Sequence, residues 1–389
     1  MVKILQVLGS YMPAAKFGGA NRVMYSYANI LSERYRVEVI TTDAKDKNGR
    51  IKDFEKLAES RNFRVNYHRV HSPYLTSEKN LTLSISFWLS ILRNVKNYSH
   101  CHLAEFRGLT VFFVKVALYL NRDVKLIHSG FGMLGELNNK SFIKTALVSV
   151  YDKIFTPLLI KRIDLALVES ELEVLEYKRF GYSGPYQVIP HCVVRSEMEQ
   201  AIVRERDDFN LSPLEYNLVS VTRIHASKGI LNAVKLVAQL NIHSKQRRYK
   251  LTICGNDEGA LQQVVDYVQG NDLNDQVKII PPCYTEERFL LYSAADAFVL
   301  LPDQNLQTSL ASIEALTENC FIINNENSYI AGLQESGAGC TLELDGDIDF
   351  DKLIFALDNA ESKPKEFYQS NMSSEVVRKI LFDSVFFEQ

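Results

Sequence analysis

Two cations in one short segment suggest a site for an anion. Arg223 and Lys228 follow an apolar run, Leu218–Val221, which is typical of a short buried strand. Apolar residues then return at helical spacing over Ile230–Leu240. Ser227 is a good N-cap, so the segment would present backbone N–H groups together with two positive side chains. That arrangement suits a diphosphate, although a crossover loop with solvated charges explains the same residues equally well.

A carboxylate on the apolar face of a later helix is the second feature that could do chemistry. A predicted strand, Ala297–Leu301, leads through a polar loop into a predicted helix near Thr308–Glu318. Glu314 shares one face of that helix with Leu310, one helical turn earlier. Because an unpaired buried charge is costly, Glu314 needs a partner. A ribose diol and a neighbouring lysine both stay open as that partner.

Together the two segments resemble the carboxyl-terminal half of the retaining glycosyltransferases of family 4, also called glycosyl transferases group 1. In that family a strand ends in the motif G-R-x-x-x-x-K-G, and Thr222–Gly229 reads T-R-I-H-A-S-K-G here. A later helix of the family carries the second Glu of an E-x7-E motif, which corresponds to Glu314. Leu306 stands where the family has its first Glu, so Asn305 or Asp303 would partly replace that group.

Three further segments carry the same resemblance. Gly18–Arg22 is similar to the family's G-G-x-E-R loop, with Asn for Glu, and that loop borders the sugar phosphate and the acceptor. His128–Gly130 resembles the family's P-H-G, whose histidine reaches the transferred sugar, although a lone histidine at a strand end is more often structural. Pro282–Tyr284 would lie near the nucleotide base and hold it largely through the backbone.

These matches imply a set of site residues. The resemblance implies catalytic roles for Arg223, Lys228 and His128. It implies donor binding by Gly18, Gly19, Cys283, Thr308, Ser309, Leu310 and Glu314.

The order of the predicted elements indicates the fold class. Strands and helices alternate through both halves of the 389-residue chain, which predicts an α/β protein with two parallel sheets covered by helices. In such sheets, ligands bind beyond the carboxyl ends of the strands. The resemblance implies the GT-B fold, in which two Rossmann-like domains face a central cleft. We expect an acceptor-side domain at 1–195, a linker at 196–212, a nucleotide-sugar domain at 213–366 and a helix at 367–389 that crosses back.

Composition excludes several classes of protein. A net charge of −3 argues against a nucleic-acid binder. No apolar run approaches the length of a membrane span, and Val2–Gly9 is too short for a signal peptide and is predicted to be a strand. The six cysteines are scattered without a C-x-x-C pair, which is typical of reduced thiols in a cytoplasmic protein. Neither a zinc site nor a disulfide framework is expected.

The chemistry implied by the resemblance is transfer of a sugar from a nucleotide diphosphate donor to an acceptor hydroxyl. Arg223 and Lys228 would neutralise charge on the leaving diphosphate without a metal, and no D-x-D motif suggests a divalent ion. No cofactor is expected besides the nucleotide sugar, which is the substrate. Retention of anomeric configuration is implied by the resemblance alone. Two other classes stay open: a GT-B nucleotide-sugar epimerase, and a catalytically silent protein that binds a sugar nucleotide or a partner transferase.

The predicted first domain also has features of a membrane-surface protein. Leu81–Tyr98 is predicted to be a helix that is apolar almost all round before it turns basic, and it contains Trp88. Asn138–Arg162, one long helix or two, mixes basic and apolar residues. We expect a lipid-linked glycan of a bacterial surface polysaccharide as acceptor, with peripheral contact at the inner face of the cytoplasmic membrane. The alternative is ordinary packing of amphipathic helices. The tail Phe367–Gln389 is predicted to be one amphipathic helix.

Overall fold

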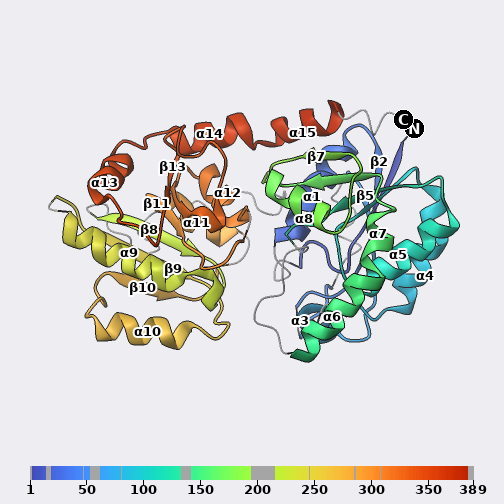
Figure 1. Cartoon of the computed structure of the whole chain (residues 1–389), viewed down its shortest axis with the longest axis horizontal. Helices are drawn as coiled ribbons and strands as arrows, with labels where there is room; N and C mark the ends of the chain where they lie inside the picture. The colour runs from blue at the N-terminus through green and yellow to red at the C-terminus, as the bar shows by residue number, and fades with distance from the viewer. Residues whose placement is uncertain are drawn as a thin grey trace. The chain divides into compact units, whose positions relative to one another are not determined.

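The computed structural model describes residues 2–14, 19–46, 48–52, 62–79, 81–132, 142–193, 215–244, 246–283, 286–306 and 308–383. The chain divides into two compact units. The first comprises Met1–Val194 and Ser374–Gln389, and the second comprises Arg195–Ser373. Each unit is a parallel sheet covered by helices, which confirms the predicted α/β class (Figure 1). The expected linker at 196–212, and Gly18, lie outside the described residues.

The first unit contains a sheet with the strand order β3-β2-β1-β4-β5-β6-β7. Its strands are β1 (Lys3–Val7), β2 (Arg36–Thr42), β3 (Arg64–His68), β4 (His100–Leu103), β5 (Lys125–Ser129), β6 (Leu165–Val168) and β7 (Tyr186–Val188). The chain moves outward from β1 to β3 and then continues from β4 to β7 on the other side. β1 and β4 therefore flank the topological switch point at which such sheets bind ligands.

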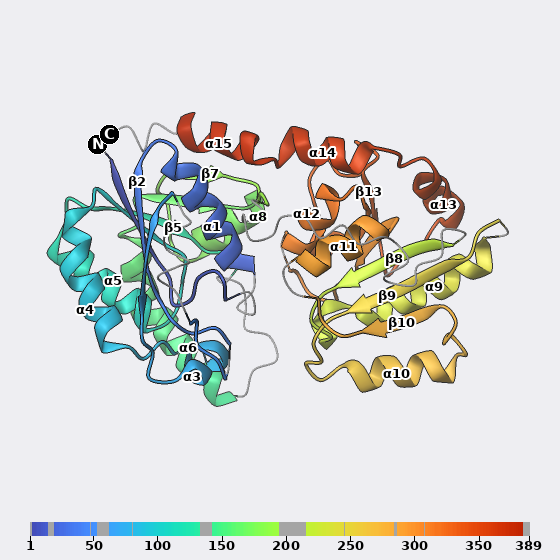
Figure 2. The same cartoon turned by 180° about the vertical axis from the view of Figure 1, so that it is seen from behind.

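The helices of the first unit cover both faces of this sheet (Figure 2). They are α1 (Gly19–Ser32), α3 (Pro73–Lys79), α4 (Ile85–Asn94), η2 (Val95–Asn97), α5 (Leu109–Leu120), α6 (Phe142–Ile154), α7 (Thr156–Ile160), α8 (Glu171–Arg179) and α15 (Ser374–Asp383). Apolar residues of β1, β4, β5 and β6 pack against α4, α5, α7 and α8 in one core. The carboxyl-terminal α15 packs on α1, where Val377 and Leu381 are buried and Arg378 Nε lies 2.8 Å from Glu33 Oε2.

Two predicted helices differ from those observed. The helix expected at Leu81–Tyr98 begins only after Ser84, whose hydroxyl accepts the Phe87 backbone N–H at 3.3 Å as an N-cap. The single helix expected at Phe367–Gln389 is wrong, because two helices meet at Asn371–Ser374, which reads N-M-S-S. Asparagine and serine side chains compete for backbone hydrogen bonds, so they favour helix ends over helix interiors.

The second unit contains a parallel sheet with the strand order β10-β9-β8-β11-β12-β13. Its strands are β8 (Tyr216–Val221), β9 (Tyr249–Cys254), β10 (Val277–Ile280), β11 (Ala297–Leu300), β12 (Phe321–Asn325) and β13 (Gly339–Leu342). Its helices are η5 (Ala226–Lys228), α9 (Ile230–His243), α10 (Leu261–Gly270), α11 (Glu286–Ala294), α12 (Leu310–Thr317), η6 (Glu326–Ser328), α13 (Phe350–Asp358) and α14 (Lys363–Asn371). β8 and β11 lie side by side at the switch point of this sheet.

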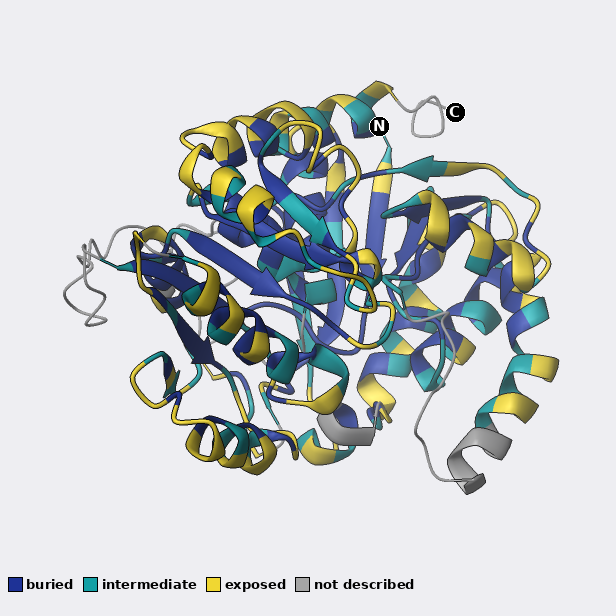
Figure 3. Cartoon of the chain, turned by 60° about the vertical axis from the view of Figure 1, so that its left-hand side comes forward, coloured by how far each residue is buried: buried dark blue, intermediate teal, exposed yellow. Residues whose placement is uncertain are grey.

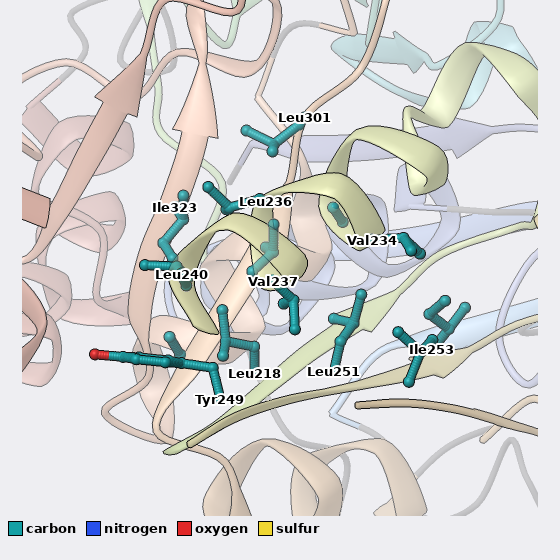
Figure 4. Packing of buried hydrophobic residues seen from close by; sticks show 14 of the residues in the cluster. Leu218, Val234, Leu236, Val237, Leu240, Tyr249, Leu251, Ile253, Leu301 and Ile323 are labelled. Carbon is teal, nitrogen blue, oxygen red and sulfur yellow. The ribbon is translucent and has the colours of Figure 1, made fainter. Parts of the chain in front are cut away.

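The core of the second unit lies between α9 and the strands beneath it. Val234, Val237 and Leu240 of α9 face Leu218 and Leu251 of β8 and β9 (Figure 4). Both sheets are buried, whereas the outward helix faces are exposed (Figure 3). Among the described ranges, no helix combines the length and the hydropathy that a membrane crossing requires.

Candidate functional site

The segment after β8 places Arg223 beside the loop after β9. β8 and β9 pair in register up to Val221 and Cys254, and the pairing resumes where the Ile224 N–H donates to the Asn256 carbonyl at 2.8 Å. The Arg223 side chain is 60% exposed, and its Nη1 donates to Glu258 Oε2 at 2.8 Å. Glu258 was not among the predicted site residues, although it lies in the polar loop that follows the neighbouring strand.

The next residues form a short 3₁₀ turn rather than a helix capped by Ser227. The His225 imidazole accepts the Ser227 N–H at 3.2 Å and caps this turn. Gly229 then adopts a left-handed conformation, with φ +64°, and is the N-cap of α9. The predicted capping role of Ser227 is therefore wrong, because the extra turn delays the start of α9 until after the glycine. Lys228 is the last residue of the turn.

Lys228 is half-buried at the end of this turn. Burial, followed by the nearby Arg223 charge, lowers the pKa of its ammonium to about 8, although the Glu258 charge acts in the opposite direction. The two predicted cations thus lie close enough to interact. A bound anion would offset the cost of burying the Lys228 charge and the repulsion between the two cations.

Gly229 allows the Lys228 turn to pack directly on the segment after β11. A Cβ at Gly229 would lie 1.7 Å from the Leu301 carbonyl oxygen, so only glycine fits there. In the first turn of α9, Asn232 Nδ2 donates to Leu301 O at 3.0 Å and to Asp303 Oδ1 at 2.8 Å. These contacts join the loop with the two cations to the loop that precedes α12.

Side-chain amides at the end of β12 and just after it hold the same loop from its other side. Asn325 Nδ2 and Asn327 Nδ2 donate to the Pro302 carbonyl at 2.9 and 3.0 Å. The Leu306 N–H donates to the Asn327 carbonyl at 2.8 Å. Because Asn325 is buried, its bond is shielded from water and stabilises the position of Pro302 in the described part of the loop.

The predicted donor-binding residues Thr308, Ser309 and Leu310 follow this loop at the amino end of α12. All three are half-buried, and Ser309 is the N-cap without a side-chain cap bond. The first backbone N–H groups of a helix have no intrahelical acceptor and attract anions. In the second unit, the chain that contacts Gly229 and Asn232 thus leads on to a helix amino end at the same edge of the sheet.

Glu314 has a protein partner that neither sequence interpretation named. Its side chain is buried, at 2% exposure, and Oε2 accepts from Arg288 Nε at 2.8 Å. Arg288 on α11 is itself only 4% exposed. The expected requirement for a partner is therefore met by an arginine rather than a lysine. The signal for Arg288 was the buried carboxylate itself, because a buried acid needs a cation nearby.

Cys283 lies in the segment after β10, beside Cys254 at the end of β9. The Cys283 backbone N–H donates to Cys254 Sγ at 3.0 Å. Cys283 is half-buried, and Cys254 is buried. This segment, like the Arg223 turn and the α12 amino end, lies at the carboxyl edge of the sheet.

In the first unit, His128 is fully buried and both its ring nitrogens are occupied. Nε2 lies 3.0 Å from the Glu105 carbonyl, which can only accept, so Nε2 carries the proton and Nδ1 accepts from the Tyr177 hydroxyl. Burial lowers the pKa of His128 to about 4, so the ring is neutral. This environment fits a structural role, which is the commoner role of a lone histidine at the end of a strand. The role at the transferred sugar stays a prediction, and it requires one of these bonds to be exchanged.

The glycine loop of the first unit is described only from Gly19, the first residue of α1. Asn21, which replaces the Glu of the family motif, is buried, and its Nδ2 donates to Ser10 Oγ at 3.0 Å. This bond joins the start of α1 to the segment after β1. Asn21 therefore has a structural contact at the carboxyl edge of the sheet.

Two buried carboxylates and a histidine, missed in the sequence, follow β6 and β7. His191 Nε2 lies 2.5 Å from Glu169 Oε2. Glu173 accepts the Gly132 N–H at 3.0 Å and the Glu169 N–H at 2.9 Å. Burial, followed by the charge of Glu169, raises the pKa of Glu173 to about 7. The signal in the sequence was an acidic residue directly after a buried strand.

Two family models match the sequence. The model of Glycosyltransferase Family 4 matches residues 17–197, and the model of Glycosyl transferases group 1 matches residues 203–331. The two matches follow one another and account for most of the chain. No curated protein matches the sequence significantly.

Several solved structures are similar over the whole chain. HepE from Anabaena, in complex with UDP and glucose, has 13% identity and a TM-score of 0.71, with 99% of this chain and 100% of that chain covered. Sucrose-phosphate synthase from Thermosynechococcus elongatus has 16% identity and a TM-score of 0.68, with 100% of both chains covered. WaaG, a glycosyltransferase involved in lipopolysaccharide biosynthesis, has 13% identity and a TM-score of 0.63, with 98% of this chain and 100% of that chain covered. These likenesses confirm the GT-B fold.

Gly229→Ala should destabilise the second unit. The left-handed backbone alone costs a residue with a Cβ about 1–2 kcal/mol, and the contact with Leu301 must also open. Gly270→Ala is the matched control, because its Cβ would meet open space at the end of α10, and it should be neutral or gain up to about 1 kcal/mol. Differential scanning calorimetry checks both. Equal transition temperatures for the two variants would contradict the packing described for Gly229.

Proposed function

Because the chain belongs to the group 1 glycosyltransferases of family 4, which use nucleotide sugars, we propose that it transfers a sugar from a nucleoside diphosphate donor to an acceptor hydroxyl with retention of configuration. The observation that carries this proposal is the Arg223–Gly229 turn. It presents two cations at the carboxyl edge of the sheet, and Gly229 and Asn232 hold it against the segment after β11, which leads on to α12.

The turn would act on the leaving group. As the glycosidic bond breaks, negative charge grows on the diphosphate, and Arg223, Lys228 and the first N–H groups of α12 would neutralise it. Arg223 would exchange Glu258 for a phosphate oxygen, which is inexpensive because this ion pair is exposed. The leaving phosphate would accept the proton of the acceptor hydroxyl, so no separate base and no metal ion is required.

Glu314 is proposed to bind the nucleotide ribose, as the family motif implies. The Arg288 guanidinium would fix the orientation of its carboxylate, and the two side chains come from neighbouring helices. Thr308, Ser309 and Leu310 would bind phosphate oxygens through the backbone of the α12 amino end. The HepE structure holds UDP and glucose, which supports a uridine nucleotide as the first ligand to test.

Arg223→Ala and Lys228→Ala should each weaken the binding of UDP. A charge-assisted contact is worth about 1.5–3 kcal/mol, so each variant should lose roughly 10-fold to 150-fold in affinity. Isothermal titration calorimetry measures the effect. Arg248→Ala is the matched control, because this exposed arginine precedes β9 at the opposite edge of the sheet and should bind as the unaltered chain does. If Arg223→Ala and Lys228→Ala both bound UDP as tightly as the unaltered chain, the proposed site would be wrong.

The affinity for UDP should fall as the pH rises above about 8. The pKa of Lys228 is about 8 without ligand, and only the protonated form attracts the diphosphate. Above that pH, Lys228 must take up a proton before it attracts the diphosphate. The affinity for UDP therefore falls by up to about tenfold per pH unit. Lys228→Arg, which keeps its charge, should show a flatter dependence. An affinity that does not change between pH 7 and 9 would contradict a direct contact with Lys228.

Turnover should persist in EDTA. Two cations and a helix amino end supply the positive charge that a divalent ion would otherwise provide. Donor consumption is measured with a panel of nucleotide sugars, in chelator, with a lipid-linked glycan present. Activity that strictly requires manganese or magnesium would contradict this mechanism.

A second candidate function is a catalytically silent protein that binds a sugar nucleotide. Leu306 in place of the first Glu of the family motif favours it, and so does the full hydrogen bonding of the buried His128. The same assay separates the two candidates, because the silent protein would bind UDP through Arg223 and Lys228 without consuming any donor.

We also propose that the acceptor is a lipid-linked glycan and that the first unit contacts an anionic membrane surface. An apolar surface, here called the α4–α7 face, is made of exposed side chains. They are Ile85, Leu89, Phe112, Val150, Ile154 and Leu158. Trp88 stacks on Phe113 with ring centroids 4.6 Å apart, which joins α4 to α5. Phe112 contacts Phe155, which joins α5 to the residue between α6 and α7.

Cations border the α4–α7 face. Lys153, Lys161 and Arg93 are exposed on the same helices or next to them. Arg107 forms a bidentate pair with Asp152, which neutralises an acid on α6. An apolar surface with a basic border is typical of peripheral binding to anionic lipid, where each cation contributes about 1 kcal/mol.

Anionic liposomes should retain the protein at low salt and release it at high salt. Replacing both Ile85 and Ile154 by Asp should abolish retention, because the two charges would lie in the α4–α7 face. Ile242→Asp is the matched control, since Ile242 is 70% exposed on α9 of the second unit. Co-sedimentation measures binding. Failure of the unaltered chain to bind at low salt would favour a soluble acceptor and leave the nucleotide site untouched.

A further inference from the structure

Two cysteines lie together at the carboxyl edge of the second sheet, and we propose that they form a reversible disulfide that weakens nucleotide binding. The pair is Cys254, the last residue of β9, and Cys283, which follows β10. The effect on the nucleotide rests on the proposed function of this edge. The modification itself rests only on the geometry of the two sulfurs.

The local structure brings the two sulfurs to one point. β9 and β10 are parallel neighbours in which Cys254 pairs with Ile280, and the chain then turns back at Pro281 toward the end of β9. Cys254 Sγ lies 3.4 Å from the Pro281 carbonyl oxygen and accepts the Cys283 N–H at 3.0 Å. Cys283 Sγ lies 4.0 Å from the same carbonyl oxygen. The thiol at the end of β9 and the thiol that follows β10 thus lie near one carbonyl oxygen.

The two thiols have different accessibility, which sets the order of the reaction. Cys254 is buried, and the neighbouring Cys283 thiol, followed by burial, raises its pKa well above the usual value. Cys283 is half-buried and therefore reachable by a small oxidant. Cys283 is the attacking sulfur, and Cys254 resolves the intermediate.

A low-molecular-weight disulfide such as oxidised glutathione supplies the oxidant. The Cys283 thiolate attacks one sulfur of it, a mixed disulfide forms, and one small thiolate leaves and takes a proton. Cys254 then loses its proton and attacks the Cys283 sulfur, and the second small thiolate leaves. Two protein thiols are oxidised to one disulfide, and one small disulfide is reduced to two thiols.

The bond would disturb the Arg223 turn through the backbone that follows Cys254. A Cβ at Gly255 would lie 1.8 Å from the Thr222 carbonyl oxygen, so the two segments are in direct contact. Three residues further, Glu258 holds Arg223. A disulfide needs its sulfurs about 2.05 Å apart, so the bond would hold the two segments at one fixed separation. This constraint would act on the loop that holds Arg223 and on the backbone proposed to hold the base.

The test compares the full chain in reduced and oxidised glutathione. Alkylation followed by peptide mass mapping identifies the cross-link, and calorimetry measures the affinity for UDP in each state. We expect a Cys254–Cys283 cross-link and an affinity about tenfold lower, which is the loss of roughly one charge-assisted contact. Dithiothreitol should restore the original affinity.

Three single variants serve as controls, each compared with itself in the two redox states. Cys254→Ser and Cys283→Ser should show no change in affinity on oxidation. Cys340→Ser should respond as the unaltered chain does, because Cys340 is equally half-buried but lies on β13.

Each outcome has one meaning. Absence of the cross-link in the unaltered chain overturns the proposal, and a cross-link with unchanged affinity overturns the regulatory effect. If UDP binds in neither state, the proposed function fails, and the mass map still decides whether the disulfide forms.

Discussion

The contact between Gly229 and the Leu301 backbone is the constraint on which the candidate site of the second unit depends. β8 and β11 are neighbouring parallel strands, so the segments that follow them leave the sheet at the same edge. A side chain at Gly229 would keep those segments apart. With glycine, the 3₁₀ turn ends against the segment after β11, and α9 begins at a position where Asn232 reaches Leu301 and Asp303. One missing side chain thus sets the positions of Lys228 and of the loop before α12.

Two ion pairs at this edge differ in burial, and burial decides what each can do. Arg223 and Glu258 are exposed, and such pairs contribute about 0–1 kcal/mol, so an anionic ligand can displace the glutamate at little cost. Arg288 and Glu314 are buried, and removing one partner of such a pair costs about 3–5 kcal/mol. The exposed pair is a replaceable contact for a mobile arginine, whereas the buried pair is a fixed support between α11 and α12.

Local patterns in the sequence predicted the two sheets and the positions of Arg223, Lys228 and Glu314 within their elements. The partners of these residues could not be predicted in the same way. Glu258 lies 35 residues from Arg223, and Arg288 lies 26 residues from Glu314, so only the folded sheet brings each pair together. The wrong cap at Ser227 has a different origin. A left-handed glycine after a 3₁₀ turn leaves the same periodicity as a capped helix, and only backbone geometry distinguishes the two.

Lys228 links stability to function in this unit. The folded pKa of about 8 is below the usual 10.5, so between these two values the unfolded chain holds a proton that the folded chain has lost. Stability therefore rises with pH through that window, and below about pH 8 the protonated lysine carries its full desolvation cost. A purely structural position would be more stable with an apolar side chain of similar length. The charge is explained if a diphosphate neutralises it, because the ligand then removes a cost that the unliganded fold cannot remove by itself.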